Sequence, residues 1–338
     1  MNWRDGQNFL RKVTIKKVFN AAKVFLSYKI SKTTGKLFHK GLPISISIEP
    51  TTSCNLRCPE CPSGLRSFTR PTGMLNLTLF RKIIDQMKDH VIYLTLYFQG
   101  EPYLNPDFLN MVKYASSNKI YTSTSTNAHY LSDESAKKTV ESGLDRLIIS
   151  IDGTTQEVYE VYRKGGKLDK VIEGTEKILK WKKALKSSTP HIIFQFLVVK
   201  ANEDQVEEVN KLAGILGVDE VVLKTAQIYD YENGSELIPE KDKYSRYKQT
   251  NNGKWVLKNK LENSCWKMWQ SCVFTWDGKV LPCCFDKDGQ FQLGDMKTDA
   301  FDSIWNNDKY KAFRKSILNS RKEIEICKNC TEGTKVWA

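Results

Sequence analysis

Residues 44–225 alternate short β-branched runs with longer amphipathic segments, and this alternation constrains the fold more than any other feature of the chain. Strands are predicted at residues 44–49, 93–98, 120–125, 146–151, 192–199 and 220–223. Helices are predicted between them at residues 77–88, 106–117, 133–141, 168–185 and 203–216, with Asn105 and Ser132 placed to cap two of them. Repeated strand–helix units indicate an α/β fold with a parallel sheet. Six strands are too few for a closed eight-stranded barrel, so we expect an open, partial (β/α)6 TIM-like barrel.

The alternation stops after about residue 224. Residues 226–262 are polar and rich in Tyr, Asn and Lys, and we expect a linker or a substrate-facing segment there. Residues 263–338 contain six cysteines and few long periodic segments, which is typical of a small domain stabilised by metal. The predicted organisation is therefore a basic, helical extension at 1–42, the partial barrel at 43–225, the linker at 226–262 and a small C-terminal cysteine-rich domain at 263–338.

Most of the net charge of +13 lies at the start of the chain, because residues 1–42 hold ten Lys or Arg against one acid, Asp5. The body of the protein is therefore only weakly basic. No cluster of aromatic and basic residues marks a nucleic-acid groove, so nucleic acid is disfavoured as a partner. Apolar residues recur at roughly helical spacing between the lysines of this extension. We favour a helix packed on the outside of the main domain; the alternative is a basic helix on an anionic membrane surface or an acidic partner.

The nine cysteines fall into two groups, one of three residues near position 58 and one of six between Cys265 and Cys330. No stretch is apolar for long enough to cross a bilayer and no cleavable leader is recognisable, so we expect a cytoplasmic protein. In a reducing cytoplasm, clustered cysteines usually bind metal or carry out redox chemistry. An odd number of cysteines also argues against a fully paired set of disulfides.

The first group follows the first predicted strand with the spacing C-x3-C-x2-C, at Cys54, Cys58 and Cys61. Three thiolates on one loop can bind three irons of a four-iron cluster and leave the fourth iron open for reaction, by the logic that separates open metal sites from closed ones. Zinc is the alternative. A structural zinc ion would need a fourth ligand, such as His90 or His129, and would favour a non-catalytic scaffold or a nucleic-acid-binding protein.

The loop and the motifs after the next strands resemble the radical S-adenosylmethionine (radical SAM) superfamily over about residues 44–225. Gln-Gly-Glu-Pro at 99–102 is similar to the family's Gly-Gly-Glu-Pro motif, and Thr126-Asn127 to its Thr-Asn-Gly stretch. Ser150 and Asp152 match a Ser-x-Asp pattern, and Arg163 resembles an arginine that reaches the cofactor carboxylate. One departure is Glu60, because the family usually has an aromatic residue just before the third cysteine. The resemblance implies S-adenosylmethionine contacts from Gln99, Gly100, Glu101, Pro102, Asn127, Ser150, Asp152 and Arg163.

The resemblance also implies a reaction. A [4Fe-4S] cluster with an open iron, held by the three cysteines of the loop, would chelate S-adenosylmethionine. An electron from a donor such as flavodoxin or ferredoxin would then cleave the cofactor, and the resulting 5′-deoxyadenosyl radical would take a hydrogen atom from the substrate. The protein's contribution to such chemistry is positioning and exclusion of water.

The second group of cysteines can hold either an auxiliary cluster or zinc, and the spacing alone does not separate the two. This part of the chain resembles the SPASM/Twitch domains, whose pattern begins Cys, nine to fifteen residues, Gly, four residues, Cys. Twelve residues separate Cys265 from Gly278 and four separate Gly278 from Cys283, whereas Cys272 does not fit. The resemblance implies one auxiliary [4Fe-4S] cluster, whose ligands are Cys265, Cys283, Cys327 and Cys330.

Two further cysteines lie outside this predicted ligand set. We expect Cys272 to be a small buried side chain. Cys284 is a candidate catalytic donor of a proton or hydrogen atom, or else a buried structural residue. The substrate is expected to be a peptide or protein, or a small polar molecule, with residues 229–247 forming part of its binding wall.

Overall fold

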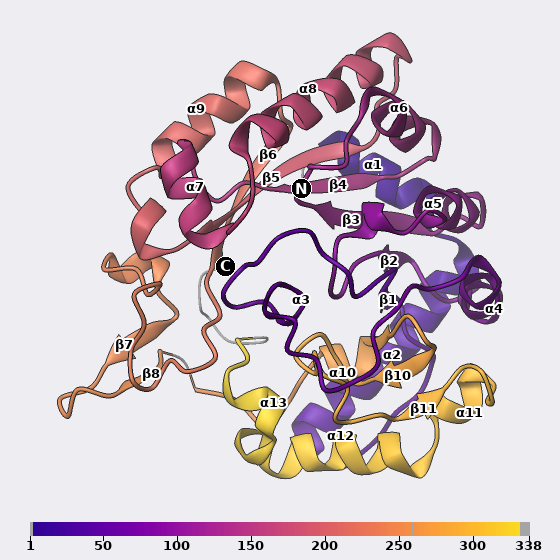
Figure 1. The fold of residues 1–338 in the computed structure, drawn as a ribbon. Coiled ribbons are helices and arrows are strands. Elements are labelled where there is room, and N and C mark those ends of the chain that lie inside the picture. The colour runs from indigo at the N-terminus through magenta and orange to yellow at the C-terminus, as the bar shows by residue number, and fades with distance from the viewer. Residues whose placement is uncertain (1–2, 259, 332–338) are drawn as a thin grey trace.

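The computed structural model describes residues 3–258 and 260–331 (Figure 1). All six predicted barrel strands are present and pair in parallel, in chain order. They are β1 (Ser45–Ile48), β2 (Tyr93–Thr95), β3 (Tyr121–Thr126), β4 (Arg146–Ser150), β5 (His191–Val198) and β6 (Glu220–Thr225). The sheet ends at β6 and does not close on itself within the described residues. The prediction of an open, partial α/β barrel is therefore confirmed.

The five predicted barrel helices are also present and flank the curved sheet in Figure 1. They are α4 (Leu77–Met87), α5 (Phe108–Ser117), α6 (Asp133–Glu141), α8 (Leu168–Ala184) and α9 (Val206–Leu216), with the short α7 (Gln156–Tyr162) before α8. Ser132 caps α6 as predicted, because its hydroxyl accepts a hydrogen bond from the Ser135 amide at 3.1 Å.

The cap predicted at Asn105 is wrong. Asp107 precedes α5, and Asn105 follows a 3-10 turn at Pro102–Leu104. The Asn105 side-chain amide donates to the carbonyls of Pro50, at 2.7 Å, and Leu75, at 2.9 Å. This buried amide therefore braces the chain leaving β1.

The core lies between the sheet and its helices. Alternate strand residues are buried on the sheet, and helix residues such as Phe80, Met111 and Ile178 pack against them. The buried strand residues include Ile46, Ile48, Leu94, Leu147, Ile149, Phe194 and Phe196. Burial of one such side chain stabilises the fold by about 1.5–3 kcal/mol.

The tail, residues 263–331, extends the barrel sheet. Its strand β9 (Ser271–Phe274) pairs in parallel with β1, so that Cys272 lies opposite Ile46. Strands β10 (Lys279–Leu281) and β11 (Gly294–Asp295) continue the sheet in antiparallel order. The helices of the tail are α10 (Lys267–Gln270), α11 (Phe301–Trp305), α12 (Asp308–Ser320) and α13 (Glu325–Lys328). The sequence did not predict this continuous sheet, which fixes the tail rigidly against the barrel.

Between barrel and tail, the predicted linker contains a small hairpin of β7 (Tyr247–Gln249) and β8 (Trp255–Leu257). Tyr247 is buried, and its ring stacks on Tyr231 with 4.7 Å between centroids. The segment is therefore partly folded onto the body of the protein.

The basic extension is helical, as predicted, and forms α1 (Trp3–Arg11) and α2 (Ile15–Thr34). Asp5 of α1 bonds the Tyr121 hydroxyl and the Arg146 guanidinium, at the starts of β3 and β4. Within the described residues, no helix combines the length and apolarity needed to cross a membrane.

Candidate active site

The three cysteines of the loop lie together at the carboxyl end of β1, as expected for a site on a parallel β/α sheet. Cys58 is buried, and Cys54 and Cys61 are partly exposed. All three line one cavity of about 110 Å³, which we call the loop cavity. Burial raises the pKa of the Cys54 thiol to about 11, so iron binding there must displace a proton. The loop is bound to the barrel through the Arg57 amide, which donates to the Lys164 carbonyl at 3.0 Å.

The predicted motif after β2 packs directly on the cysteine loop. Gly100 has φ +75°, and a Cβ atom there would lie 2.3 Å from the Thr51 carbonyl oxygen. Its amide donates to the Ser63 hydroxyl at 2.9 Å, and the Glu101 amide donates to the Ser53 carbonyl at 2.8 Å. Only glycine satisfies both the left-handed backbone and this close approach.

Glu101 is a buried carboxylate within this motif. Its oxygens accept hydrogen bonds from the Thr126 hydroxyl and from the Asn127 amide, each at 2.8 Å. Burial raises the pKa of Glu101 to about 7, and the hydrogen bonds offset part of that effect. The carboxyl group also lines the loop cavity. It is therefore positioned to accept a hydrogen bond from a cationic or amine-bearing ligand.

Asn127 links the end of β3 to the cysteine loop. Its side-chain amide donates to the side-chain oxygen Oδ1 of Asn55 at 2.8 Å and lies 3.9 Å from the Cys54 sulfur. On another side of the loop, the side-chain oxygen Oε1 of Gln99 lies 3.9 Å from the Cys61 sulfur. Each of these amides is thus adjacent to one of the three thiols.

The buried Asp152 and the partly buried Arg163 form an ion pair next to the Cys58 thiol. The Arg163 Nε donates to Asp152, while its Nη1 lies 3.8 Å from the Cys58 sulfur. Asp152 also accepts from the Leu197 amide at 2.7 Å, which fixes the carboxylate on β5. The ion pair with Asp152 orients the Arg163 guanidinium. Its positive charge lies at the wall of the loop cavity, where it can pair with a ligand carboxylate.

The predicted residues divide by position. Those that line the loop cavity with the three cysteines are Gly100, Glu101, Asn127, Ser150 and Arg163. Gln99, Pro102 and Asp152 lie behind them and do not line it. The sequence prediction missed other lining residues, among them Ser63, Tyr97 and Ser125. Tyr97 and Ser125 lie at the carboxyl ends of β2 and β3, so the general position of active sites in β/α barrels could have indicated them.

The four cysteines assigned from the SPASM/Twitch pattern line a second, much smaller cavity of about 10 Å³, which we call the tail cavity. Its other walls are largely apolar and include Met268, Phe313 and Ile317. Arg321, which the sequence did not indicate, is buried there, and its Nη2 lies 3.3 Å from the Cys330 sulfur. A buried guanidinium beside several thiols favours their ionised, metal-binding form.

The remaining two cysteines lie elsewhere. Cys272 is buried on β9, as predicted, and burial raises the pKa of its thiol. Cys284 is half-buried, and its sulfur lies 3.8 Å from the Lys267 ammonium. It lines neither cysteine cavity. Among the described residues, no three His, Cys, Asp or Glu side chains are grouped tightly enough to hold a single metal ion. The candidate ligands are instead brought together as walls of two cavities.

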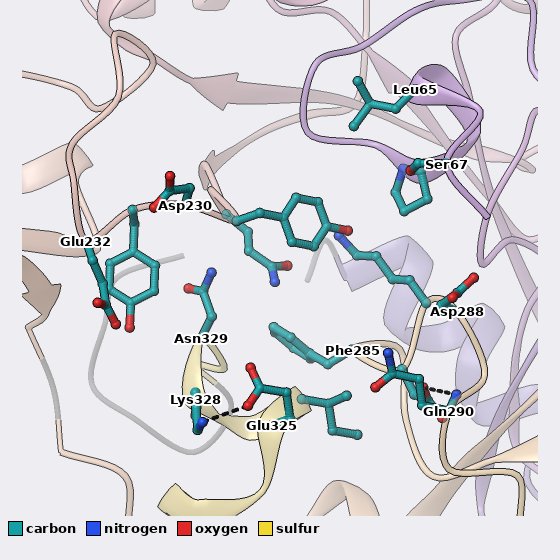
Figure 2. Close-up of a pocket in the computed structure, with 17 residues that line it drawn as sticks. Leu65, Ser67, Asp230, Glu232, Phe285, Asp288, Gln290, Glu325, Lys328 and Asn329 are labelled. Carbon is teal, nitrogen blue, oxygen red and sulfur yellow. Dashed lines mark hydrogen bonds and ion pairs between the residues drawn. The ribbon is translucent and has the colours of Figure 1, made fainter. Parts of the chain in front are cut away.

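A third cavity, of about 510 Å³, opens beside the cysteine loop, and we call it the large cavity. Figure 2 shows Leu65 and Ser67 on its α3 side (α3, Pro62–Leu65), Asp230 and Glu232 on the segment after β6, and Asn329 at the end of α13. Barrel, linker and tail therefore all contribute to its wall.

Glu60 accounts for part of this arrangement. Its carboxylate accepts a hydrogen bond from the Tyr229 amide at 2.9 Å, which holds Tyr229 beside the cysteine loop. The Lys287 ammonium lies 4.8 Å from the Tyr229 ring centroid, and burial lowers the pKa of this lysine. Tyr229 and Lys287 both line the large cavity, as does Tyr231 from the same predicted wall. Tyr229 of the linker thus lies near Glu60, which occupies the position where the family motif usually has an aromatic residue.

Comparison with known proteins agrees with this geometry. Residues 48–213 match the radical SAM superfamily, and residues 265–331 match the SPASM iron-sulfur cluster-binding domain. The chain is a radical SAM superfamily enzyme with a C-terminal SPASM domain. It therefore uses a [4Fe-4S] cluster and S-adenosylmethionine, and of the two metals considered for the cysteine groups the family supports iron–sulfur.

Three similar proteins illustrate what the chain resembles. It is 27% identical over 315 residues to the tungsten-containing aldehyde ferredoxin oxidoreductase cofactor-modifying protein of Pyrococcus furiosus, covering 84% of this chain and 86% of that protein. The structure of SuiB of Streptococcus suis bound to the precursor peptide SuiA aligns with TM-score 0.63 and 14% identity, over 92% of this chain and 75% of SuiB. The structure of BtrN with AdoMet and 2-DOIA aligns with TM-score 0.52 and 19% identity, over 88% and 95%. The two structural matches support the fold.

Proposed function

We propose that Cys54, Cys58 and Cys61 hold the [4Fe-4S] cluster that binds S-adenosylmethionine. The observation that carries this proposal is the convergence of three thiols, a buried carboxylate and a partly buried arginine on the loop cavity. A cluster held there would supply the electron that cleaves S-adenosylmethionine to methionine and a 5′-deoxyadenosyl radical, and this radical would take a hydrogen atom from the substrate.

The protein residues around the thiols bind and orient the cofactor. Glu101 accepts a hydrogen bond from its amino group, and Arg163, held by Asp152, pairs with its carboxylate. Asn127 and Ser150 offer hydrogen bonds to its ribose and methionine portions. Gln99, Gly100 and Pro102 shape the loop that brings Glu101 to the site. Binding of both charged ends leaves the sulfonium group in one orientation, which is the main contribution that a protein makes to such a reaction.

We further infer that the tail holds one auxiliary [4Fe-4S] cluster on Cys265, Cys283, Cys327 and Cys330. Support comes from the shared cavity that these four side chains line and from Arg321 beside it. Four protein ligands leave no open iron, so this cluster would transfer electrons or stabilise the fold. Cys284 remains a candidate donor of a proton or hydrogen atom to the substrate.

The large cavity is the proposed substrate site. Its volume of about 510 Å³ suits a short peptide segment or one small polar molecule, and it adjoins the cysteine loop through Pro62 and Leu65. We favour a peptide, because SuiB, which has this fold, is described in complex with a precursor peptide. BtrN with 2-DOIA, in turn, supports a small-molecule substrate. A cytoplasmic flavodoxin or ferredoxin is the proposed electron donor.

The proposal is tested by purifying the protein without oxygen and measuring iron, colour and product. We expect a brown protein with about eight irons, the sum of two four-iron clusters. Reduction with dithionite in the presence of S-adenosylmethionine should release 5′-deoxyadenosine, and Cys58→Ala should abolish this release. Cys272→Ala is the matched control, because that buried cysteine lines neither cavity. This variant should keep the full iron content and should still release 5′-deoxyadenosine. A colourless zinc protein, or product from Cys58→Ala, would refute the assignment.

A further inference from the structure

Helix α2 is packed with its polar side inward. The residues that it buries are Lys17, Asn20, Val24, Ser27 and Ser31, of which only one is apolar. A surface helix normally turns its apolar stripe toward the core, because burial of that stripe is what holds it in place. Val24 and Tyr28 of α2 pack against the core, whereas most of its other large apolar residues are exposed.

The polar inner face is held by specific hydrogen bonds. The Asn20 side chain both donates to the Leu42 carbonyl, at 2.8 Å, and accepts from the Leu42 amide, at 2.9 Å. The Ser31 hydroxyl forms the same two-way pairing with Phe38, at 2.6 and 2.8 Å. Residues 38–42 thus run back along α2 and form hydrogen bonds with polar side chains of its inner face. The opposite face of the helix therefore points outward.

That outer face is a continuous apolar stripe. Ile15 is 76% exposed, Phe19 66% and Leu26 59%, and Val18 and Ile30 are also exposed. With about 3.6 residues per turn, positions 15, 18, 19, 22 and 26 fall on one side of the helix. Soluble surfaces rarely leave such a contiguous apolar patch uncovered, so it indicates a binding surface.

The charges around the stripe indicate what binds. Lys16 and Lys23 lie along one flank of the apolar residues and Lys29 and Lys32 along the other, and all four are exposed. Residues 1–42 hold ten Lys or Arg against one acid. A second copy of the chain would bring two strongly basic surfaces together, which disfavours self-association. An apolar helical face bordered by lysines instead matches the interface of an anionic bilayer, where acyl chains receive the stripe and phosphates receive the ammonium groups. We propose that α2 docks the protein on an anionic membrane surface.

The fold places this surface away from the catalytic side. Lys17 contacts the Lys119 carbonyl just before β3, Asn20 contacts Leu42 just before β1, and the Trp269 indole just before β9 donates to Phe38. The helix therefore covers the amino ends of the parallel strands, whereas the cysteine loop lies at their carboxyl ends (Figure 1). A docked protein would keep both the loop cavity and the large cavity open to the cytoplasm. Docking does not depend on the catalytic assignment.

The test is flotation of the full-length protein with vesicles of phosphatidylcholine containing 30% phosphatidylglycerol, compared with pure phosphatidylcholine. We expect binding to the anionic vesicles that weakens at high salt. Phe19→Ser with Leu26→Ser should reduce the partition coefficient at least tenfold, because two large apolar side chains no longer enter the bilayer. Lys23→Gln with Lys29→Gln should reduce it by about 25-fold, since each basic residue near such a surface contributes about a fivefold gain.

Matched controls lie on α9. Ile215→Ser removes a side chain that is 83% exposed, and Lys211→Gln removes an exposed lysine, so both should leave binding unchanged. The α2 variants should keep wild-type 5′-deoxyadenosine formation in solution, which separates loss of docking from loss of fold. Absence of binding to anionic vesicles would overturn the proposal. An equal loss of vesicle binding in the α9 controls would also overturn it. The same holds if mutation of the apolar stripe of α2 alters only self-association or the binding of an acidic protein.

Discussion

The two cysteine-lined cavities differ in size and in the chemistry of their walls. The loop cavity holds about 110 Å³ and presents a carboxylate, a guanidinium and an amide beside three thiols. The tail cavity holds about 10 Å³ and presents mostly apolar side chains beside four thiols. The loop cavity is therefore larger and has more polar groups in its wall than the tail cavity. This difference separates a reactive cluster site from a closed one better than cysteine spacing alone.

Each cavity nevertheless has one arginine near a thiol, partly buried in the loop cavity and buried in the tail cavity. Arg163 is anchored by Asp152 and so keeps a defined orientation toward the loop cavity. Arg321 is anchored by the Ser264 carbonyl at 2.8 Å, and its other nitrogen faces the thiols. The first arginine is thus positioned to bind a ligand carboxylate, whereas the second can only offset the negative charge of its own thiolates.

The largest expected effect is that cysteine variants of one cavity lose its cluster while the cluster and ligand binding of the other cavity are kept. Cys330→Ser should lose about four of the irons. It should also lower the melting temperature by at least about 5 °C, because a bound cluster contributes to folding. Affinity for S-adenosylmethionine should change less than about twofold, since the loop cavity is intact. Iron analysis, thermal unfolding and anaerobic binding measure the three quantities.

Cys58→Ala should give the reverse pattern, with the tail irons kept and S-adenosylmethionine binding lost. Cys272→Ala again serves as the control for loss of a buried thiol. If Cys330→Ser retained all its iron, the assignment of the tail ligands would be wrong.

A smaller effect is expected at Gly100, where the loop cavity depends on close backbone packing. Gly100→Ala would place a Cβ 2.3 Å from the Thr51 carbonyl, so the cysteine loop must shift. We expect S-adenosylmethionine affinity to fall at least about tenfold, because a displacement near 1 Å disrupts a preorganised site. Binding to the reconstituted protein measures this.

Gly217→Ala is the matched control, because Gly217 has φ +84° and open space around it. It should cost about 1 kcal/mol of stability from the backbone conformation alone and leave affinity unchanged. Equal affinity losses in the two variants would mean that the Gly100 contact does not shape the site.

The barrel could be predicted because its signals are local. Each strand is a short run rich in β-branched residues and each helix is amphipathic, and the interactions that define them lie within a few residues. The loop motifs could be placed for the same reason, since parallel strands bring their carboxyl ends to one edge. Asn105 shows the limit of local reasoning, because an amide three residues before a helix can cap it or, as here, bridge two distant carbonyls.

The parts that could not be predicted depend on pairing across long stretches of chain. Strand β9 joins β1 although more than 200 residues separate them, and a four-residue run carries no information on its partner. The bond from Glu60 to the Tyr229 amide has no sequence signature either. The direction in which α2 faces could not be predicted either, because its periodicity is the same whether the apolar stripe lies inside or outside.

The smallest expected effect is a pH dependence that originates at Glu101. Burial raises the pKa of this carboxyl to about 7, with the nearby Arg163 charge and three hydrogen bonds acting in the opposite direction. Above this pH the ionised group is a strong acceptor for the cofactor's amino group, and below it the neutral acid is a much weaker one. Affinity for S-adenosylmethionine should therefore fall as the pH is lowered from 8 to 6, by roughly tenfold for one unit below the pKa. The same shift makes the folded protein bind this proton more tightly, so the stability that it contributes is lost as the pH rises from about 4.5 through 7.

Glu101→Gln isolates this contribution. The variant cannot titrate, so its affinity should be weaker than wild type at pH 8 and nearly constant between pH 6 and 8. Asn127 and Thr126 both donate to the wild-type carboxylate, and the new amide leaves one of these donors without an acceptor, which accounts for the weaker baseline. Anaerobic titrations across this range, with cluster absorbance checked at each pH, measure the two slopes. Parallel slopes in wild type and variant would assign the titration to another group, such as His129 beside Asn127 or the cofactor's own amine, and would remove Glu101 from the binding role.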